Sequence, residues 1–176
     1  PHSIEFDSAG KSLFICDIGN HRIRRVDLDT GMIETWCGNG RKDTTKDGAS
    51  IGTETPLKGP RALALAPDGE LWLALREGNA VYRVDMKTKT LHHVAGTGKK
   101  GFSGNGGPAK QAALSGPKGV AISPDGMMTS VDLLGHLDDV RVEGSVQPAV
   151  CRYHDDNRII EHIPRIEQRV CTGIHV

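Results

Sequence analysis

The sequence lacks the features that place a protein in a membrane or on a polyanion. No apolar run among the 176 residues approaches the roughly 20 residues that a spanning helix needs. The first residues, PHSIEFDSAG, have neither the basic nor the apolar region of a signal peptide. The 22 Lys and Arg balance the 22 Asp and Glu, so that no net field favours nucleic acid. We expect no membrane span and no nucleic-acid partner.

Metal and redox motifs are also missing. No C-x-x-C spacing occurs among the four cysteines, Cys16, Cys37, Cys151 and Cys171. His92 and His93 are adjacent on an expected strand, so their side chains point to opposite faces and cannot share a metal ion. The loop that contains Asp43 and Asp47 lacks the register of oxygen ligands found in an EF-hand. We therefore expect no metal and no cofactor.

A glycine-rich loop comes close to two functional motifs, but the secondary structure that each motif needs is not expected around it. Gly96, Gly98 and Gly101 have the G-x-G-x-x-G spacing, but further glycines and a proline follow where a dinucleotide site needs a helix. Ser103 falls one residue short of a G-x-S-x-G nucleophile. We expect a compact loop followed by a helical turn over 109–114, and we assign no catalytic residue.

What the sequence does have is glycine, proline and a repeat. Its 22 Gly and 9 Pro separate short apolar runs, which is typical of an all-β protein with many turns. Pro1, Pro60 and Pro117 open units that align at a period of 57 to 59 residues. A period of this size indicates a repeat array or a propeller.

Each unit contains four expected strands, the content of one propeller blade. In the first unit they cover about 3–6, 13–17, 21–27 and 32–37. The second strand, LFICD or LWLAL, is apolar without alternation, which predicts burial on both faces by neighbouring sheets. Cys16 and Cys37 fall on strands two spacings apart, too far for a disulfide, so we expect free thiols.

The motif GNHRIRRVD resembles the NHL repeat. The matching positions are Asp17, Asn20, His21, Ile23 and Arg25. The second unit departs from the pattern, with Leu75 and Asn79 in place of the Asp and the His. The run GTGKKGFSGNGGPAKQAALSGPKGVAISPDG resembles the long glycine-rich connection of bacterial NHL-repeat proteins.

This resemblance implies a six-bladed propeller in many members, often secreted or at the cell surface, which serves as a platform for protein, carbohydrate or nucleic-acid partners. Six blades need roughly 340 residues, so we expect this chain to be a fragment that lacks the remaining blades. The predicted fold is all-β, with two complete four-stranded antiparallel blades at 1–59 and 60–116. A third blade starts at 117–136.

The segment 137–176 fits no blade. The expected continuation is replaced by LDDVRVEGSV, and no turn or glycine-rich loop follows. Two explanations remain open, a diverged terminal segment and a frameshift, and the loss of every motif at one point favours the frameshift. End blades without neighbours are also expected to leave apolar faces exposed.

Strand direction divides the expected blades into two ends. The loops 39–59 and 97–116 share one end with the turns at 19–20 and 77–78, which we call the loop face. The turns at 9–10, 29–31 and 68–69 lie at the opposite end, the turn face. Structural roles in the repeat are assigned to Asp17, Asn20, His21, Asp27, Gly69, Asp85 and Gly126.

Recognition residues usually accumulate on long loops over a rigid scaffold, so we predict a binding scaffold for a protein or carbohydrate that uses the loop face. The contact candidates are Arg22, Arg41, Lys99, Lys100, Phe102 and Asn105. In one alternative the loops only pack between blades, with Phe102 and Leu114 as buried anchors. In another, the chain is part of a propeller hydrolase or lyase with a metal at the channel mouth.

Overall fold

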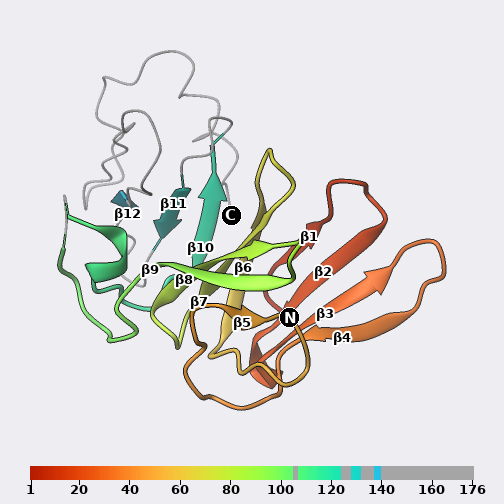
Figure 1. The fold of residues 1–176 in the computed structure, drawn as a ribbon, viewed down its shortest axis with the longest axis horizontal. Coiled ribbons are helices and arrows are strands. Elements are labelled where there is room, and N and C mark those ends of the chain that lie inside the picture. Colours follow the sequence, from red (N-terminus) through yellow and green to blue (C-terminus); the bar gives the residue numbers. More distant parts are fainter. Residues whose placement is uncertain (105–106, 124–127, 132–136, 140–176) are drawn as a thin grey trace.

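The computed structural model describes residues 1–104, 107–123, 128–131 and 137–139, and within them the chain forms three antiparallel sheets (Figure 1). The helices of these described ranges are two single 3-10 turns, η1 (Ile18–Asn20) and η2 (Ala109–Gln111). No helix in this part of the chain is long and apolar enough to cross a membrane. The all-β prediction is confirmed.

The first sheet is one complete blade. Its strands are β1 (Ile4–Phe6), β2 (Ser12–Asp17), β3 (Arg22–Asp27) and β4 (Ile33–Cys37), and each pairs with the next along the chain. Every bound lies within one residue of the expected strand, because the glycine turns between the apolar runs fix where each strand ends. Gly10 is one such turn residue, with a φ of 66°.

The second sheet is a complete blade with one extra strand. Its own strands are β6 (Pro60–Leu65), β7 (Leu71–Leu75), β8 (Ala80–Asp85) and β9 (Thr90–Ala95). The two-residue strand β5 (Ala49–Ser50) comes from the connection between the blades and pairs with β9 at the outer edge. The connection therefore covers an edge that would otherwise be open, a feature that the sequence did not predict.

The third sheet begins another blade with β10 (Gly119–Ile122) and β11 (Met128–Val131), and β12 (Leu137–Asp139) pairs with β11. β12 lies at the start of the segment that we expected to leave the repeat. The remainder of that segment, 140–176, falls outside the described residues, and so does Gly126.

The sheets pack against one another through their first strands. β6 contacts β1 and β2 of the first blade on one side and β10 of the third on the other (Figure 1). All five residues of β7 are buried as a result, which confirms the expected burial on both faces for that strand. For β2 the same expectation is wrong, because burial alternates there, with Phe14 and Cys16 buried and their neighbours half-buried.

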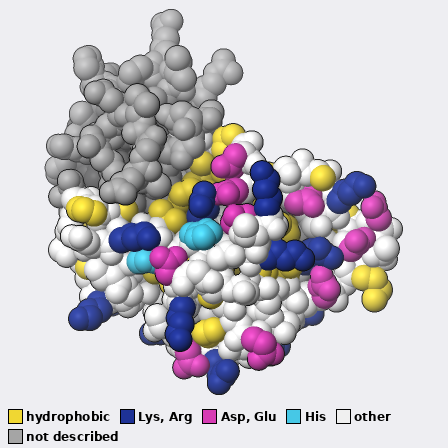
Figure 2. All heavy atoms as spheres, viewed as in Figure 1, with side chains coloured by type: hydrophobic (Ala, Val, Ile, Leu, Met, Phe, Trp, Pro, Cys, Tyr) yellow, Lys and Arg dark blue, Asp and Glu magenta, His cyan; other side chains and the backbone are white. Residues whose placement is uncertain are grey.

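Blade 1 leaves apolar side chains in solvent. The exposed fractions are 60% for Ile4, 50% for Phe6, 70% for Met32 and 52% for Ile33. Acidic and basic side chains are mixed over the face drawn in Figure 2, as the balanced composition requires. Exposed apolar residues on this blade agree with the expectation that an end blade leaves a face open.

Cys16 and Cys37 are buried free thiols, as expected. Burial raises the pKa of the Cys16 thiol to about 12 and also raises the pKa of Cys37. Thiolates are the reactive form of cysteine, so both side chains act as small apolar core residues.

Candidate functional site

The loop face is fastened by one hydrogen bond that recurs in both complete blades. The backbone N–H of Gly59 donates to His21 Nδ1 over 3.1 Å, and the N–H of Gly116 donates to Asn79 Oδ1 over 3.0 Å. His21 and Asn79 both have a positive φ, 54° and 47°, in the tight turn after the second strand of their blades. The replacement of His by Asn therefore keeps the acceptor that holds the start of the next blade.

A second recurring contact lies beside the first. A Cβ on Gly38 would meet the carbonyl oxygen of His21, and one on Gly96 would meet the carbonyl oxygen of Asn79. Both glycines have a positive φ, 110° and 91°. The chain that leaves the fourth strand thus passes directly against the turn before the third, and only glycine fits there.

Asp17 and Asn20 belong to the same turn of blade 1. The amide of Asn20 donates to both carboxylate oxygens of Asp17, over 3.1 and 2.9 Å. Leu75 occupies the place of Asp17 in blade 2 and is 1% exposed. This position of the repeat can therefore hold either a polar residue that hydrogen-bonds within its turn or an apolar residue that packs in the core.

The turn face is closed by short turns with carboxylate caps. Asp27 accepts hydrogen bonds from the N–H and hydroxyl of Thr30, and Asp85 accepts the N–H groups of Lys87 and Thr88. These hydrogen bonds hold the pKa of Asp27 below its usual value and lower the pKa of Asp85 to about 2. Gly69, with a φ of 85°, closes the first turn of blade 2.

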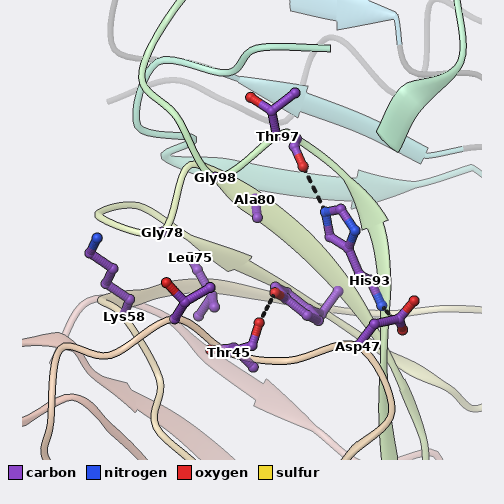
Figure 3. Close-up of a pocket in the computed structure, with 12 residues that line it drawn as sticks. Thr45, Asp47, Lys58, Leu75, Gly78, Ala80, His93, Thr97 and Gly98 are labelled. Atoms are coloured by element: carbon purple, nitrogen blue, oxygen red, sulfur yellow. Dashed lines mark hydrogen bonds between the residues drawn. The ribbon is translucent and has the colours of Figure 1, made fainter. Parts of the chain in front are cut away.

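A cavity of about 180 Å³ opens at the loop face of blade 2, between the two long loops (Figure 3). The first loop contributes Thr44, Thr45, Asp47 and Lys58, and the second contributes Thr97 and Gly98. The floor and walls come from the blade itself, from Leu75, Gly78, Ala80, Tyr82, His93 and Gly96. The cavity thus brings together segments more than 50 residues apart in the chain.

Most polar groups on one side of this cavity are already paired. The Asp47 carboxylate accepts the backbone N–H of His93 over 2.8 Å and lies 3.4 Å from the ammonium of Lys110. That hydrogen bond, helped by Lys110, holds the pKa of Asp47 below its usual value. His93 Nε2 lies 2.7 Å from the carbonyl oxygen of Gly96, to which it donates as the protonated ring nitrogen. These contacts make a fixed wall.

Tyr82 completes that wall. Its hydroxyl donates to the carbonyl oxygen of Thr45 over 2.6 Å, and its ring packs at a centroid distance of 5.3 Å from the His93 ring. Burial, reinforced by the charge of Asp47, raises the pKa of the Tyr82 hydroxyl to about 12. The phenol therefore stays neutral and anchors the first loop to the blade.

Lys58 lies at the opposite end of the cavity from Asp47 and His93 (Figure 3). Its side chain is half-buried, and among the described residues no carboxylate lies within ion-pair distance of its ammonium. An ammonium in that position has donors left for a polar guest. Lys58 and Thr44 are the groups through which the cavity could hold a small ligand.

None of the predicted contact residues that the structure describes lines this cavity, and they differ in exposure. Arg41, Lys99 and Lys100 are exposed, while Arg22 is half-buried with its guanidinium against Gly40. Phe102 is 50% exposed. Asn105 lies outside the described residues.

Much of the first loop serves packing. Leu57 is completely buried and Thr45 and Thr55 are buried, so this loop fits the alternative in which loops pack between blades. In the second loop Leu114 is 2% exposed, whereas Phe102 is half exposed and does not act as the expected anchor of that alternative. The two loops therefore have a packed base and exposed tips.

Sequence reasoning missed the residues that shape the cavity, above all Asp47, Lys58, Tyr82 and His93. The only signal in the sequence is the Gly48 turn after Asp47, which lets the loop run back along β9. Within the described ranges, no group of three or more His, Cys, Asp or Glu side chains is placed to hold a metal ion.

No family model matches the chain. It is 31% identical over 147 residues to Protein SUPPRESSOR OF QUENCHING 1, chloroplastic, of Arabidopsis thaliana, an alignment that covers 78% of this chain and 14% of that protein. It is 26% identical over 132 residues to NHL repeat-containing protein 2 of Bos taurus, covering 65% of this chain and 18% of that protein. The chain therefore spans less than a fifth of these relatives.

Solved structures show the same fold. A Bacteroides thetaiotaomicron protein of unknown function superposes with a TM-score of 0.65 at 18% identity, covering 75% of this chain and 32% of that one. An auxiliary nutrient binding protein from the same organism superposes with a TM-score of 0.57 at 20% identity, covering 72% of this chain and 33% of that one. With its repeat, its stacked four-stranded blades and relatives named for the NHL repeat, the chain belongs to the NHL-repeat β-propeller family.

Proposed function

We propose that this propeller is a non-catalytic binding scaffold that recognises a protein or carbohydrate ligand through its loop face. The observation that supports it most strongly is the cavity of about 180 Å³, which both long loops enclose over blade 2. Ligand sites are typically concave and combine apolar walls with a few placed polar groups. Here Asp47, Tyr82 and His93 form one side of the cavity, and Lys58 lines the opposite end.

The two ends of the blades also differ in charge. The loops 39–59 and 97–116 contain seven Lys or Arg against three Asp or Glu, although the whole chain is neutral. The turn-face segments 7–11, 27–31, 66–70 and 85–89 contain six acidic and three basic residues. A basic end attracts acidic surfaces and anionic ligands and speeds their encounter at low salt. The proposed ligand therefore has acidic groups.

The loop tips supply the contacts in this proposal. Arg41 has only a long ion pair, 3.8 Å to Asp43, and both side chains are about two-thirds exposed. A pair of that kind contributes little and rearranges easily, so Arg41 is available to a partner. Lys99 and Lys100 are exposed in the second long loop and add to its basic charge. Phe102, which is 50% exposed, adds a ring suited to stacking on a sugar or an apolar side chain.

The test compares two variants with the same loss of charge. The loop variant changes Arg41, Lys99 and Lys100 to Ala; the control changes Lys11 and Lys87 to Ala and Lys89 to Asn, all on the turn face. Asn is chosen for Lys89 because that residue has a φ of 54°. Immobilised chain is presented to a glycan array and to a soluble cell extract, and retained ligands are titrated against each variant.

We expect the loop variant to bind at least tenfold more weakly than the unaltered chain and the control variant to bind as the unaltered chain does. Affinity should also fall as salt rises, because exposed charges are screened. Equal affinity for the loop variant, together with loss from the control variant, would reject the assignment to the loop face.

A further inference from the structure

The residue that follows the opening proline is basic in every unit. His2, Arg61 and Lys118 occupy this position after Pro1, Pro60 and Pro117. The position comes immediately after the loop-face connection, where the first strand of each blade starts. Because β6 packs between β1 and β10, these first strands lie next to one another (Figure 1). The repeat therefore gathers three basic residues at the loop-face end of neighbouring inner strands.

Arg61 is the best-defined member of this group. It lies at an irregularity of the ladder between β6 and β7, where Pro60 pairs with Leu75 and Ala62 pairs with Ala74, so that Arg61 is the additional residue. Bulges re-aim side chains and are frequent next to functional sites. The backbone N–H of Arg76 donates to the carbonyl oxygen of Gly59 over 2.8 Å, which fixes the start of β6 against the following turn.

The charges around Arg61 do not balance. Arg76 forms an ion pair of 3.0 Å with Glu77, and both side chains are 38% exposed. The Glu77 carboxylate lies directly over Gly59, and one of its oxygens is buried without a hydrogen-bond partner. Arg61 itself is half-buried, its Nε is buried without a partner, and no ion pair forms between it and any described residue. The single carboxylate of Glu77 thus lies near two arginines, Arg76 and Arg61, and forms an ion pair with Arg76 only.

A half-buried guanidinium without an ion pair is costly, because burial removes water, and the charge of Glu77 is shared with Arg76. Burial and then the neighbouring Arg76 lower the pKa of Arg61, and Glu77 offsets only part of this effect. A guanidinium has five N–H donors in a planar fork that matches the two oxygens of a carboxylate or a phosphate. An anion from solution would supply the missing charge and the missing acceptors.

We propose that the loop-face end of the inner strands is an anion-binding site, in which Arg61 binds a carboxylate or phosphate group of the ligand, assisted by N–H donors of His2 and Lys118 from the adjoining blades. This inference rests on the loop face being the binding face, and it names the chemical group that the face selects. In the chain, Arg61 follows Lys58, which lines the cavity, by three residues. A ligand that reached both would be held at two points.

The experiment titrates the whole chain with inorganic phosphate and with succinate by isothermal calorimetry at constant ionic strength. The variants are Arg61→Gln and, as a matched control, Arg83→Gln; Arg83 pairs with Glu70 near the turn face over 3.0 Å. We expect saturable binding of at least one anion, at least tenfold weakening in Arg61→Gln, and unchanged binding in Arg83→Gln. Binding of phosphate alone, or of succinate alone, assigns the class of the anionic group.

No saturable binding of either anion, or the same affinity in both variants, would overturn the proposal. If Arg61→Gln loses its cooperative thermal transition, the double variant His2→Gln with Lys118→Gln replaces it, since both side chains are exposed, and a loss of at least threefold is expected. The loop variant Arg41, Lys99 and Lys100 to Ala should bind phosphate normally. A chain that binds neither anion would therefore overturn the anion site without affecting the proposed contacts at the loop tips. Loop-tip variants that keep their affinity for the ligand would overturn those contacts without affecting the anion site.

Discussion

Blades 1 and 2 have the same repeat and the same strand order, yet they are buried to very different extents. All five residues of β7 are buried, whereas burial alternates along β2. The difference comes from the neighbours: β6 and β7 contact β10 on one side while β1 and β2 cover the other, and blade 1 has one described neighbour. A blade therefore becomes core only where sheets cover both of its faces.

The largest expected effect is the contrast between Leu73 and Ile15, which hold the same position in the two units. Leu73 is completely buried and Ile15 is half-buried. Leu73→Ala should lower the free energy of unfolding by about 2 to 5 kcal/mol, because it leaves a cavity between covered faces. Ile15→Ala should cost about 1 to 2 kcal/mol. Urea unfolding followed by circular dichroism measures both, and equal costs would contradict the contrast.

The second expected effect concerns the hydrogen bond that links each blade to the start of the next. Its loss should have a similar cost in blades 1 and 2. His21→Gly and Asn79→Gly each remove the acceptor of a backbone N–H without straining the positive φ, and each should cost about 1 to 3 kcal/mol. His21→Asn restores the acceptor found in blade 2 and should stay within about 1 kcal/mol of the unaltered chain. A large cost for His21→Asn would show that the imidazole has a role beyond this hydrogen bond.

The smallest expected effect is a dependence on pH at the turn face. The pKa of Asp85 is about 2 in the folded chain, below the roughly 3.9 of an unfolded Asp, so its carboxylate stabilises the fold above about pH 4. That contribution is lost as the pH falls from about 4 through 2. Asp85→Asn should therefore be less stable than the unaltered chain at pH 6 and approach it near pH 2. Asp27→Asn should change the stability in the same direction, because the Asp27 carboxylate also accepts hydrogen bonds within its own turn and its pKa is also lowered.

Strand bounds were predictable because they depend on local signals, namely glycine turns and short apolar runs. The strand β5 was not, because Ala49 and Ser50 have no strand pattern and pair only where β9 offers an open edge. The equivalence of His21 and Asn79 also escaped the sequence, since the two side chains match only in the position of one acceptor atom. The equivalence also depends on the positive φ of both residues, which cannot be read from the sequence.

The loop face was predictable as a location and not as a site. Chain direction alone brings the long loops to one end of the blades. The cavity depends on contacts such as that between Asp47 and His93, 46 residues apart, and on the hydrogen bond from Tyr82 to Thr45. Contacts of this kind follow from how a loop folds back over its blade, which no spacing in the sequence encodes.

Hydrogen exchange of the whole chain tests most directly the claim that the blades stack face to face as in a propeller. Amides open slowly where covering sheets must separate first, and faster where one face is already in water. We predict that the amides of β7 and β8 are the slowest to exchange, with those of β2 and β3 clearly faster although β2 and β3 also pair with a strand on each side. Equal protection in the two blades, or slower exchange in blade 1, would contradict it.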